Sequence, residues 1–373
     1  MVTFLFSTLI NLPTKKEDDM HLSRSMNRLW PSVIICGILG LAFLLIALPG
    51  AMAQQQSLEE IYEAAKEEGT VVWYVTFPLD EATPLARAFE DRYPGVTVEI
   101  VRGSGTRLAE RFETEYRANR QMCDVFTGAL MDPFLAYKKS GWLTEWKAPE
   151  GAAIPDKYKD EGFWYLEGIT MSSMLYDPSR VKKEEIPHTP MDLVKPHWKD
   201  RIGTIPSWAT GTGFEFAYFV EYVVGFKDYP EKLKVLAPKM QSAQAKLVRL
   251  VTSGEIDLAF PIADYNLYRF KKRGAKIEGV YPKEGAPTNT RPVAIPANAP
   301  HPNAAKLFLN WRLSEEGQMM MQDGFGMRSV RKGIPDVKGL TPMKDIKILI
   351  FDPAKIRPAR EDIINHWRSV FGG

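Results

Sequence analysis

Strand-like and helix-like segments alternate along this chain from Ser57 onward, and this alternation limits the possible folds more than any other feature. Ser57 and Glu60 form a helix-capping box, and Gly69 is placed to end the first helix. The pattern then predicts strands over 71–76, 96–101 and 124–127, with helices over 81–93 and 106–119 and a fourth helix that Asp132 opens and Gly141 stops. Such alternation predicts an α/β lobe with a mostly parallel sheet between helices.

A second series of elements follows. The sequence predicts an extended segment over 163–176, strands over 201–206, 256–260 and 277–280, and helices over 214–224, 231–240, 242–253 and 264–272. A chain of 373 residues has room for two lobes. No flexible linker separates them, so the extended stretches Met171–Tyr176 and Arg291–Pro296 are expected to cross between lobes that hinge about a cleft.

The N-terminal segment has the pattern of a secretory signal. Two arginines precede an apolar run at 33–48, and small residues follow, so cleavage is expected after Ala53. The run is shorter than the roughly 18 residues typical of a membrane span, although an uncleaved anchor is the alternative. Met20 or Met26 could be the true start of an over-extended sequence. We therefore expect a signal segment over 1–53 and a periplasmic or extracytoplasmic location.

Composition and motifs exclude several classes of function. The net charge of +2 has no long basic run, so nucleic acid is not an expected partner. Removal of the signal segment leaves Cys123 as the single cysteine, so no intramolecular disulfide is expected. There is no GxSxG motif, no defensible pair of catalytic carboxylates and no zinc-binding histidine motif, so neither an enzyme nor a cofactor is predicted.

Four stretches carry a resemblance to a known family. They are Asp192–Gly203, Gly254–Ala259, Asn298–Lys306 and Leu313–Gln318, where Pro302 is expected to start a helix and Gly317 to interrupt one. In this order they resemble the extracellular solute-binding proteins of ABC importers, in the branch that contains ferric-iron-binding proteins. The likeness spans roughly residues 57–335 and implies a two-lobed periplasmic-binding-protein fold, type 2-like, with a ligand cleft between the lobes.

The resemblance also implies a division of the chain and a function. Lobe 1 is expected over 54–170 plus 290–345, and lobe 2 over 171–289 plus 346–373. The implied function is capture of a small polar, anionic organic solute by hinge closure and its delivery to an ABC permease and ATPase; we expect the protein to be a monomer. The alternatives are a ferric-iron-binding protein and a sensing module for a membrane receptor.

Candidate ligand contacts lie where strands end and helices begin, because ligands of open α/β sheets bind there. Glycines in two of these segments allow close backbone approach, and helix N-termini favour anions. The predicted contacts are Thr76, Gly103, Ser104, Gly105, Thr127, Trp208, Thr210, Gly211, Thr212 and Gly213. The alternative is structural: the hydroxyl groups cap their own helices, and Trp208 packs in the core.

Tyr265, Asn266 and Arg291 complete the predicted site. The resemblance implies two adjacent tyrosines at 265–266 for ferric iron, but here Asn266 replaces the second, which removes an anionic ligand that Fe(III) favours. If iron binds, Tyr265 and Tyr268 are the expected pair. Otherwise Tyr265 and Asn266 are expected to hydrogen-bond an organic ligand, while Arg291 binds a carboxylate or phosphonate or forms a surface or hinge salt bridge.

Overall fold

The computed structural model describes residues 56–372, so the predicted signal segment lies outside the described residues. Among the residues that are described, no helix has the length and apolar character needed to span a membrane. The helices are α1 (Leu58–Glu68), α2 (Leu79–Arg92), α3 (Gly105–Arg117), α4 (Asp132–Lys139), α5 (Gly211–Tyr218), α6 (Tyr229–Val235), α7 (Gln244–Thr252), α8 (Asp264–Lys272), α9 (Pro302–Leu313), α10 (Glu315–Phe325), α11 (Pro353–Ile356) and α12 (Arg360–Phe371). A π-helical segment, Phe219–Val224, directly continues α5.

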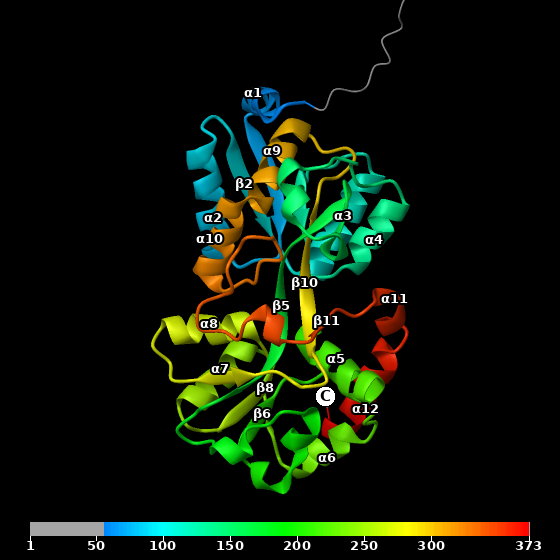
Figure 1. Cartoon of the computed structure of the whole chain (residues 1–373). Helices are drawn as coiled ribbons and strands as arrows, with labels where there is room; N and C mark the ends of the chain where they lie inside the picture. Colours follow the sequence, from blue (N-terminus) through cyan, green and yellow to red (C-terminus); the bar gives the residue numbers. More distant parts are fainter. Residues whose placement is uncertain (1–55, 373) are drawn as a thin grey trace, which may run out of the picture. The chain divides into compact units, whose positions relative to one another are not determined.

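The strands form one sheet that runs through the part of the chain that is described (Figure 1). They are β1 (Thr70–Val75), β2 (Thr97–Arg102), β3 (Val125–Thr127), β4 (Lys159–Asp160), β5 (Trp164–Tyr176), β6 (Ile202–Thr204), β7 (Lys239–Met240), β8 (Leu258–Ala263), β9 (Glu278–Val280), β10 (Ala286–Ala294) and β11 (Ile348–Leu349). The main order is β2-β1-β3-β10-β5-β8-β6-β7. Pairs within β1–β3 and within β6–β8 are parallel, while β5 and β10 are antiparallel. This confirms the predicted α/β fold.

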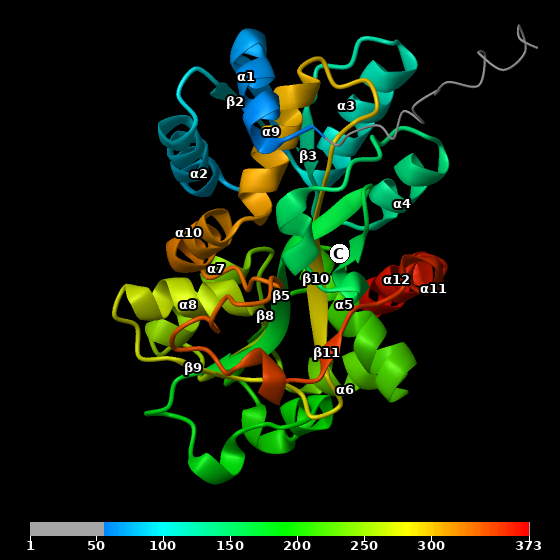
Figure 2. The ribbon, with the colours of Figure 1, turned by 45° about the horizontal axis from the view of Figure 1, so that its top comes forward.

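Two groups of elements pack at opposite ends of the β5–β10 pair (Figures 1 and 2). We call β1–β3 with α1–α4, α9 and α10 the first lobe, and β6–β8 with α5–α8, α11 and α12 the second lobe. In the first lobe, one core surrounds Trp73 and another surrounds Phe112. In the second lobe, one core surrounds Trp198 and another surrounds Leu247. Each lobe therefore buries apolar side chains on both faces of its part of the sheet, and the residue boundaries of the lobes stay a prediction.

Local sequence signals explain most element ends. Ser57 and Glu60 form the predicted capping box, with Glu60 N–H donating to Ser57 Oγ at 3.2 Å and Ser57 N–H to Glu60 Oε2 at 2.8 Å. Gly69 ends α1 in the left-handed conformation at φ 74°. Helix α8 has the predicted bounds Asp264–Lys272.

Two predicted helix boundaries are wrong. The helix expected over 231–240 ends at Val235, and Lys239–Met240 instead forms β7, because Pro238 cannot continue a helix and disfavours helical backbone in the residue before it. Gly317 does not interrupt a helix. It lies in the first turn of α10, where a Cβ would stand 2.3 Å from the carbonyl oxygen of Trp311, so glycine allows α9 and α10 to pack closely.

The second lobe holds the C-terminal helix α12 through polar contacts as well as apolar ones. Trp367 Nε1 donates to Glu221 Oε1 at 2.6 Å, and the His366 ring lies between Glu221 Oε2 at 3.3 Å and Glu231 Oε1 at 2.9 Å. Partial burial alone would lower the pKa of His366, but the hydrogen bonds to Glu231 and Glu221 outweigh it and raise this pKa. Through these hydrogen bonds His366 links α12 to the body of the lobe.

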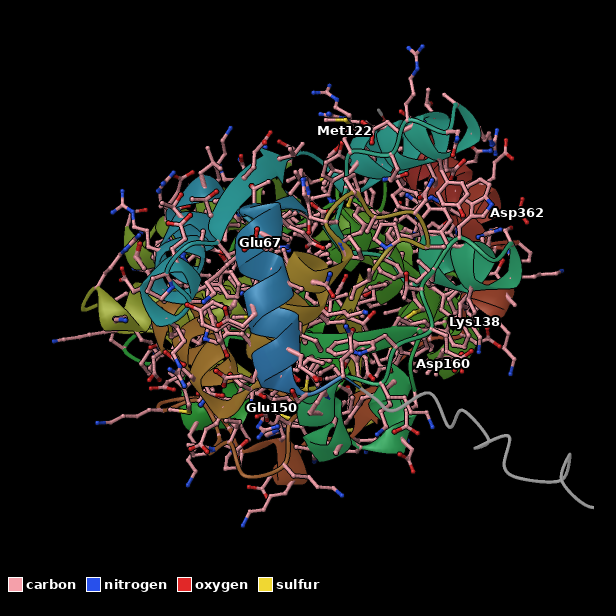
Figure 3. The ribbon with its side chains drawn as sticks, turned by 90° about the horizontal axis from the view of Figure 1, so that it is seen from above. Glu67, Met122, Lys138, Glu150, Asp160 and Asp362 are labelled. Atoms are coloured by element: carbon pink, nitrogen blue, oxygen red, sulfur yellow. The ribbon has the colours of Figure 1, made fainter. Side chains whose placement is uncertain are left out.

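In the first lobe, α4 is tied to the short strand β4. Figure 3 shows Lys138 of α4 beside Asp160 of β4, and the two side chains form an ion pair. The Lys138 ammonium also lies 4.5 Å from the centre of the Phe163 ring. These contacts fix the helix that borders the cavity described below.

Candidate functional site

The two lobes approach each other where strands end and helices begin. In the first lobe these ends are Thr76 after β1 and Thr127 at the end of β3; in the second they are Thr210 before α5 and Tyr265 in the first turn of α8. A direct contact joins the lobes here, because Arg269 Nη1 of α8 lies 2.7 Å from Glu81 Oε1 of α2. The space between the lobes is therefore lined from both sides.

Arg291 on β10 lies within electrostatic range of groups from both lobes, Glu81 of the first and Tyr265 of the second. Its Nη1 donates to the carbonyl oxygen of Thr290 at 3.2 Å, while its Nε is buried and has no hydrogen-bond partner. Asn289 projects from the same face of β10, two residues earlier, and its Nδ2 is also buried without a partner. Two neighbouring buried donors are thus left without an acceptor, which is costly unless a bound molecule supplies one.

Arg291 has acidic neighbours, yet it forms no ion pair within the described part of the chain. Glu81 is paired with Arg269, and Glu167 is paired with Arg312. Burial lowers the pKa of Arg291, and the fields of Tyr265, Glu167, Glu215 and Glu81 oppose that shift. The guanidinium is therefore a cation without a partner of its own between the lobes.

Glu215 adds a carboxyl group to the site from the first turns of α5. Its Oε2 is buried and has no hydrogen-bond partner. Burial raises the pKa of Glu215 to about 8, against the opposing fields of Arg291 and Arg360. At neutral pH this carboxyl group is mostly protonated and can donate a hydrogen bond as well as accept one.

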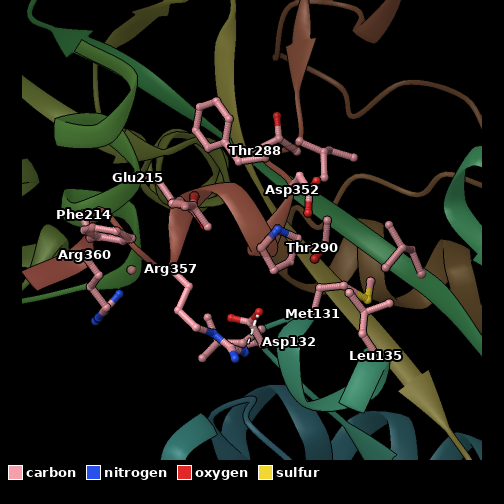
Figure 4. A pocket seen from close by; sticks show the side chains of 18 of the residues that line it. Met131, Asp132, Leu135, Phe214, Glu215, Thr288, Thr290, Asp352, Arg357 and Arg360 are labelled. Atoms are coloured by element: carbon pink, nitrogen blue, oxygen red, sulfur yellow. Dashed lines mark ion pairs between the residues drawn. The ribbon is translucent and has the colours of Figure 1, made fainter. Parts of the chain in front are cut away.

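A cavity of about 530 Å³ opens beside this cluster, and we call it the side cavity (Figure 4). The first lobe contributes Thr106, Ala129, Leu130, Met131, Asp132 and Leu135, and the second contributes Gly211, Phe214, Glu215, Ile356, Arg357 and Arg360. The remaining lining residues are Lys157, Trp164, Leu166, Thr288, Thr290, Ile350, Phe351, Asp352 and Pro353. At its rim, Arg357 Nη2 lies 2.9 Å from Asp132 Oδ1, as the dashed line in Figure 4 marks. The size is in the range of small-molecule sites.

Comparison with known proteins identifies the family of this chain. Residues 78–319 match the model of the bacterial extracellular solute-binding proteins. This chain is a bacterial extracellular solute-binding protein. The family consists of binding proteins rather than enzymes, and those of ABC transporters bind a small ligand and deliver it to a permease.

Two of three relatives of this solute-binding protein are named for binding ferric iron, and one of these two is named as periplasmic. An uncharacterised Haemophilus influenzae protein is 26% identical over 266 residues, which cover 68% of this chain and 76% of the relative. The Fe(3+)-binding periplasmic protein of Serratia marcescens is 21% identical over 275 residues, covering 70% and 79%. The Neisseria meningitidis serogroup B major ferric iron-binding protein is 23% identical over 257 residues, covering 64% and 74%.

Solved structures confirm the two-lobed fold. Iron-bound HitA from Pseudomonas aeruginosa superimposes with a TM-score of 0.68 at 23% identity, over 81% of this chain and 99% of HitA. AfuA from Actinobacillus pleuropneumoniae, bound to fructose 6-phosphate, gives a TM-score of 0.66 at 22% identity, over 81% and 98%. The two neighbours bind chemically different ligands on one fold, so the fold does not select the ligand of this solute-binding protein.

The structure brings together several of the residues that the sequence predicts for the site. Tyr265 and Arg291, far apart in sequence, lie within electrostatic range of each other. Gly211 lines the side cavity and lies close to Asn289. Thr76 is half-buried after β1, beside the first turn of α2. Their ligand contacts stay a prediction.

Other predicted residues have structural partners instead. Thr127 is fully buried, and its hydroxyl group accepts a hydrogen bond from Trp73 Nε1 at 2.9 Å. Asn266 is also buried, and its Nδ2 donates to Gln244 Oε1 at 3.0 Å, which links α8 to α7. The side-chain amide of Asn266 therefore supports the helix behind the site, and its ligand contact stays a prediction.

Trp208 and Tyr268 also have structural partners, which for Trp208 is the packing given above as the alternative to ligand contact. The Trp208 ring packs against the second-lobe core, and the Arg368 guanidinium lies 5.8 Å from its centre. The Tyr268 hydroxyl group donates to the carbonyl oxygen of Asp323 at 2.8 Å, so this tyrosine contacts α10 rather than forming a metal-binding pair with Tyr265. Both rings are held by packing that only the folded lobes provide.

The glycine-rich segments cap their own helices. Ser104 Oγ accepts the Arg107 N–H at 3.4 Å, and Thr210 Oγ1 accepts the Gly213 N–H at 3.0 Å. The glycines permit close packing: a Cβ on Gly103 would stand 2.7 Å from the Leu108 side chain. Gly105 stands close to Ala129, while Thr212 and Gly213 are buried at the start of α5. In both segments a hydroxyl group therefore caps its own helix, which is the structural role given as the alternative to ligand contact.

Sequence reasoning did not single out Glu215, Glu167 or Asn289. A usable signal was present for the two acids, because each is a lone charged residue in an otherwise apolar run: Phe214–Val220 for Glu215 and Trp164–Ile169 for Glu167. Charged residues in such runs are rarely buried without a specific role. No comparable local signal marks Asn289.

Proposed function

We propose that this protein captures a small organic anion between its lobes and delivers it to an ABC permease. The observation that carries the proposal is the pair of buried donors on β10, Arg291 Nε and Asn289 Nδ2, neither of which has a partner. A carboxylate, phosphate or phosphonate supplies the acceptor oxygens and the negative charge that both donors lack. The alternative role as a sensing module for a membrane receptor rests on the same fold, and no residue here favours it.

Capture follows from contacts made by both lobes at once. β10 provides Arg291, the second lobe provides Tyr265, and Glu81 and Arg269 bridge the lobes. A ligand that contacts both lobes binds the closed form more tightly than the open form and so shifts the protein toward closure. Changing the ratio of closed to open protein from 1:99 to 99:1 requires the ligand to bind the closed form about 5.5 kcal/mol more tightly than the open form, and a few charge-assisted hydrogen bonds supply this difference.

Ferric iron is the alternative cargo, and the donors near Tyr265 fit it less well. Tyr268 is bound to Asp323, and Asn266 is bound to Gln244. Across residues 56–372 no three histidine, cysteine or acidic side chains gather in a metal-binding arrangement. A hard trivalent ion favours several anionic oxygens, whereas the central charge in this site is the cation Arg291.

A thermal-shift screen of the purified protein tests the proposal. The panel contains simple carboxylates, sugar phosphates, phosphonates, inorganic phosphate and ferric citrate. An anion at 100 times its Kd adds about 2.7 kcal/mol to the free energy of unfolding, which is a clear rise in melting temperature. Stabilisation by ferric citrate, with a visible tyrosinate-to-iron absorption band and no response to citrate alone, would establish the iron alternative instead.

Calorimetry on variants then locates the site. Arg291→Ala and Tyr265→Phe are each expected to weaken binding of the anionic hit by about 1–3 kcal/mol, the cost of losing a charged or buried hydrogen bond. Arg249→Ala, on the exposed face of α7, is the matched control and should bind like the wild type. Unchanged affinity in both site variants would show that the anion binds elsewhere.

A further inference from the structure

The side cavity has a lining that a purely polar or ionic ligand does not require. Apolar side chains dominate its walls, and they come from segments far apart in sequence: Leu130, Met131, Leu135, Trp164, Leu166, Phe214, Ile350, Phe351 and Ile356. Three of them keep large exposed fractions, 43% for Leu130, 41% for Leu135 and 43% for Ile350. Exposed apolar side chains that converge on one concave site mark a surface that binds an apolar partner.

The side cavity borders the donors on β10, although neither Arg291 nor Asn289 is part of its lining. Glu215 lines the cavity and lies within electrostatic range of Arg291. Gly211 also lines the cavity and lies beside Asn289, so the cavity wall and the unpartnered amide meet at the start of α5. A molecule whose anionic group reaches Arg291 and Asn289 can therefore extend into the cavity past Glu215.

Glu215 is the polar group at the junction of the two parts. Its Oε2 is buried without a partner, although the Arg291 and Arg360 guanidinium groups lie within electrostatic range of it. Arg360 is held over the Phe214 ring, 4.5 Å from its centre, and does not form an ion pair with Glu215. This carboxyl oxygen is thus left with a hydrogen bond to make.

We propose that the ligand is an amphipathic organic acid: its anionic group binds at Arg291 and Asn289, and its aliphatic or aromatic body fills the side cavity. The inference rests on the proposed function and narrows the substrate class. An amphipathic ligand fits this site better than a bare ion or a fully hydroxylated sugar phosphate, because the latter two would leave the apolar cavity walls in contact with water. Burial of an apolar body removes that contact and adds affinity in proportion to its area.

Matched ligand series test the inference by isothermal titration calorimetry on the purified protein. One series is methylphosphonate, propylphosphonate and pentylphosphonate; the other is acetate, butanoate and hexanoate. Within each series the anionic group is constant and only the apolar length changes. We expect affinity to rise by up to about fourfold for each methylene that enters the cavity.

Two variants locate the gain. Leu135→Ser and Ile350→Ser remove apolar wall at partly exposed positions, so the fold is retained, and each should reduce the affinity ratio between the longest and shortest ligands. Val235→Ser is the matched control, because Val235 is 73% exposed and is not part of the cavity lining; its affinity ratio should equal that of the wild type. Thermal unfolding of each variant checks that the fold is intact.

The outcomes separate this inference from the proposed function. If short and long ligands bind equally and Arg291→Ala weakens both, the anion-binding function stands and the apolar subsite is wrong. If affinity rises with length but Leu135→Ser and Ile350→Ser both keep the full gain, the apolar body lies outside the side cavity and the inference is overturned. If no member of either series binds while another anion of the thermal-shift panel does, the anion-binding function stands and this inference is overturned; if no anion of that panel binds, both fail.

Discussion

The buried ion pair between Glu167 and Arg312 gives the sharpest test of how the first lobe is held together. Both side chains are fully buried, and Glu167 Oε2 accepts hydrogen bonds from Arg312 Nε at 3.1 Å and Nη2 at 2.7 Å. Glu167→Gln keeps the shape of the side chain but removes the counter-charge, and arginine cannot lose its proton to compensate. We expect the free energy of unfolding to fall by about 3–5 kcal/mol, the typical cost of leaving a buried charge unpaired.

Urea denaturation followed by circular dichroism measures this loss. The control is Glu63→Gln, which breaks the exposed pair of Glu63 with Lys66 (2.6 Å, with 59% of the Glu63 side chain exposed) and should change the free energy of unfolding by less than about 1 kcal/mol. The double variant Glu167→Gln, Arg312→Met removes both charges and should recover a large part of the loss. If Glu167→Gln costs no more than Glu63→Gln, the argument from burial is refuted.

Three further predictions concern other parts of the molecule. Arg357→Ala breaks the ion pair with Asp132 at the cavity rim, and because the Arg357 side chain is 68% exposed, the closed form should lose only about 0.2–1 kcal/mol of stability relative to the open form. Fluorescence energy transfer between dyes on the two lobes measures this shift toward the open form, and Arg357→Ala should cause no shift when Asp132→Ala is already present. Because the pKa of His366 is raised in the folded protein, its hydrogen bonds stabilise the fold fully below pH 6.5, and this contribution is lost as the pH rises through the folded pKa. His366→Gln should therefore lower the free energy of unfolding, measured by urea denaturation, more at pH 5.5 than at pH 9. Cys123 is fully buried, and burial raises its pKa, so its thiol should react with a thiol reagent only after unfolding. Cys36→Ser removes the other cysteine of the sequence, so that the reaction reports on Cys123 alone. Rapid reaction of this folded variant would contradict the buried placement of Cys123.

Local patterns predicted the elements well and the side-chain roles less well. The capping box at Ser57 and the bounds of α8 depend on residues within one or two turns, and both are found as expected. By contrast, the direction of the Asn266 amide depends on Gln244 in another helix, and the contact of Tyr268 depends on α10 of the other lobe. A pattern along one segment does not contain such distant partners.

The sequence by itself determined the order of strands and helices and the family, because periodicity, caps and motifs are all readable along the chain. Only the tertiary structure placed Glu215 near Arg291, left Asn289 without a partner and gathered Leu130, Leu135 and Ile350 around one cavity. The physical reason is that desolvation and unpaired charge arise when distant segments pack together. The class of ligand is therefore inferred from contacts between lobes rather than from any single motif.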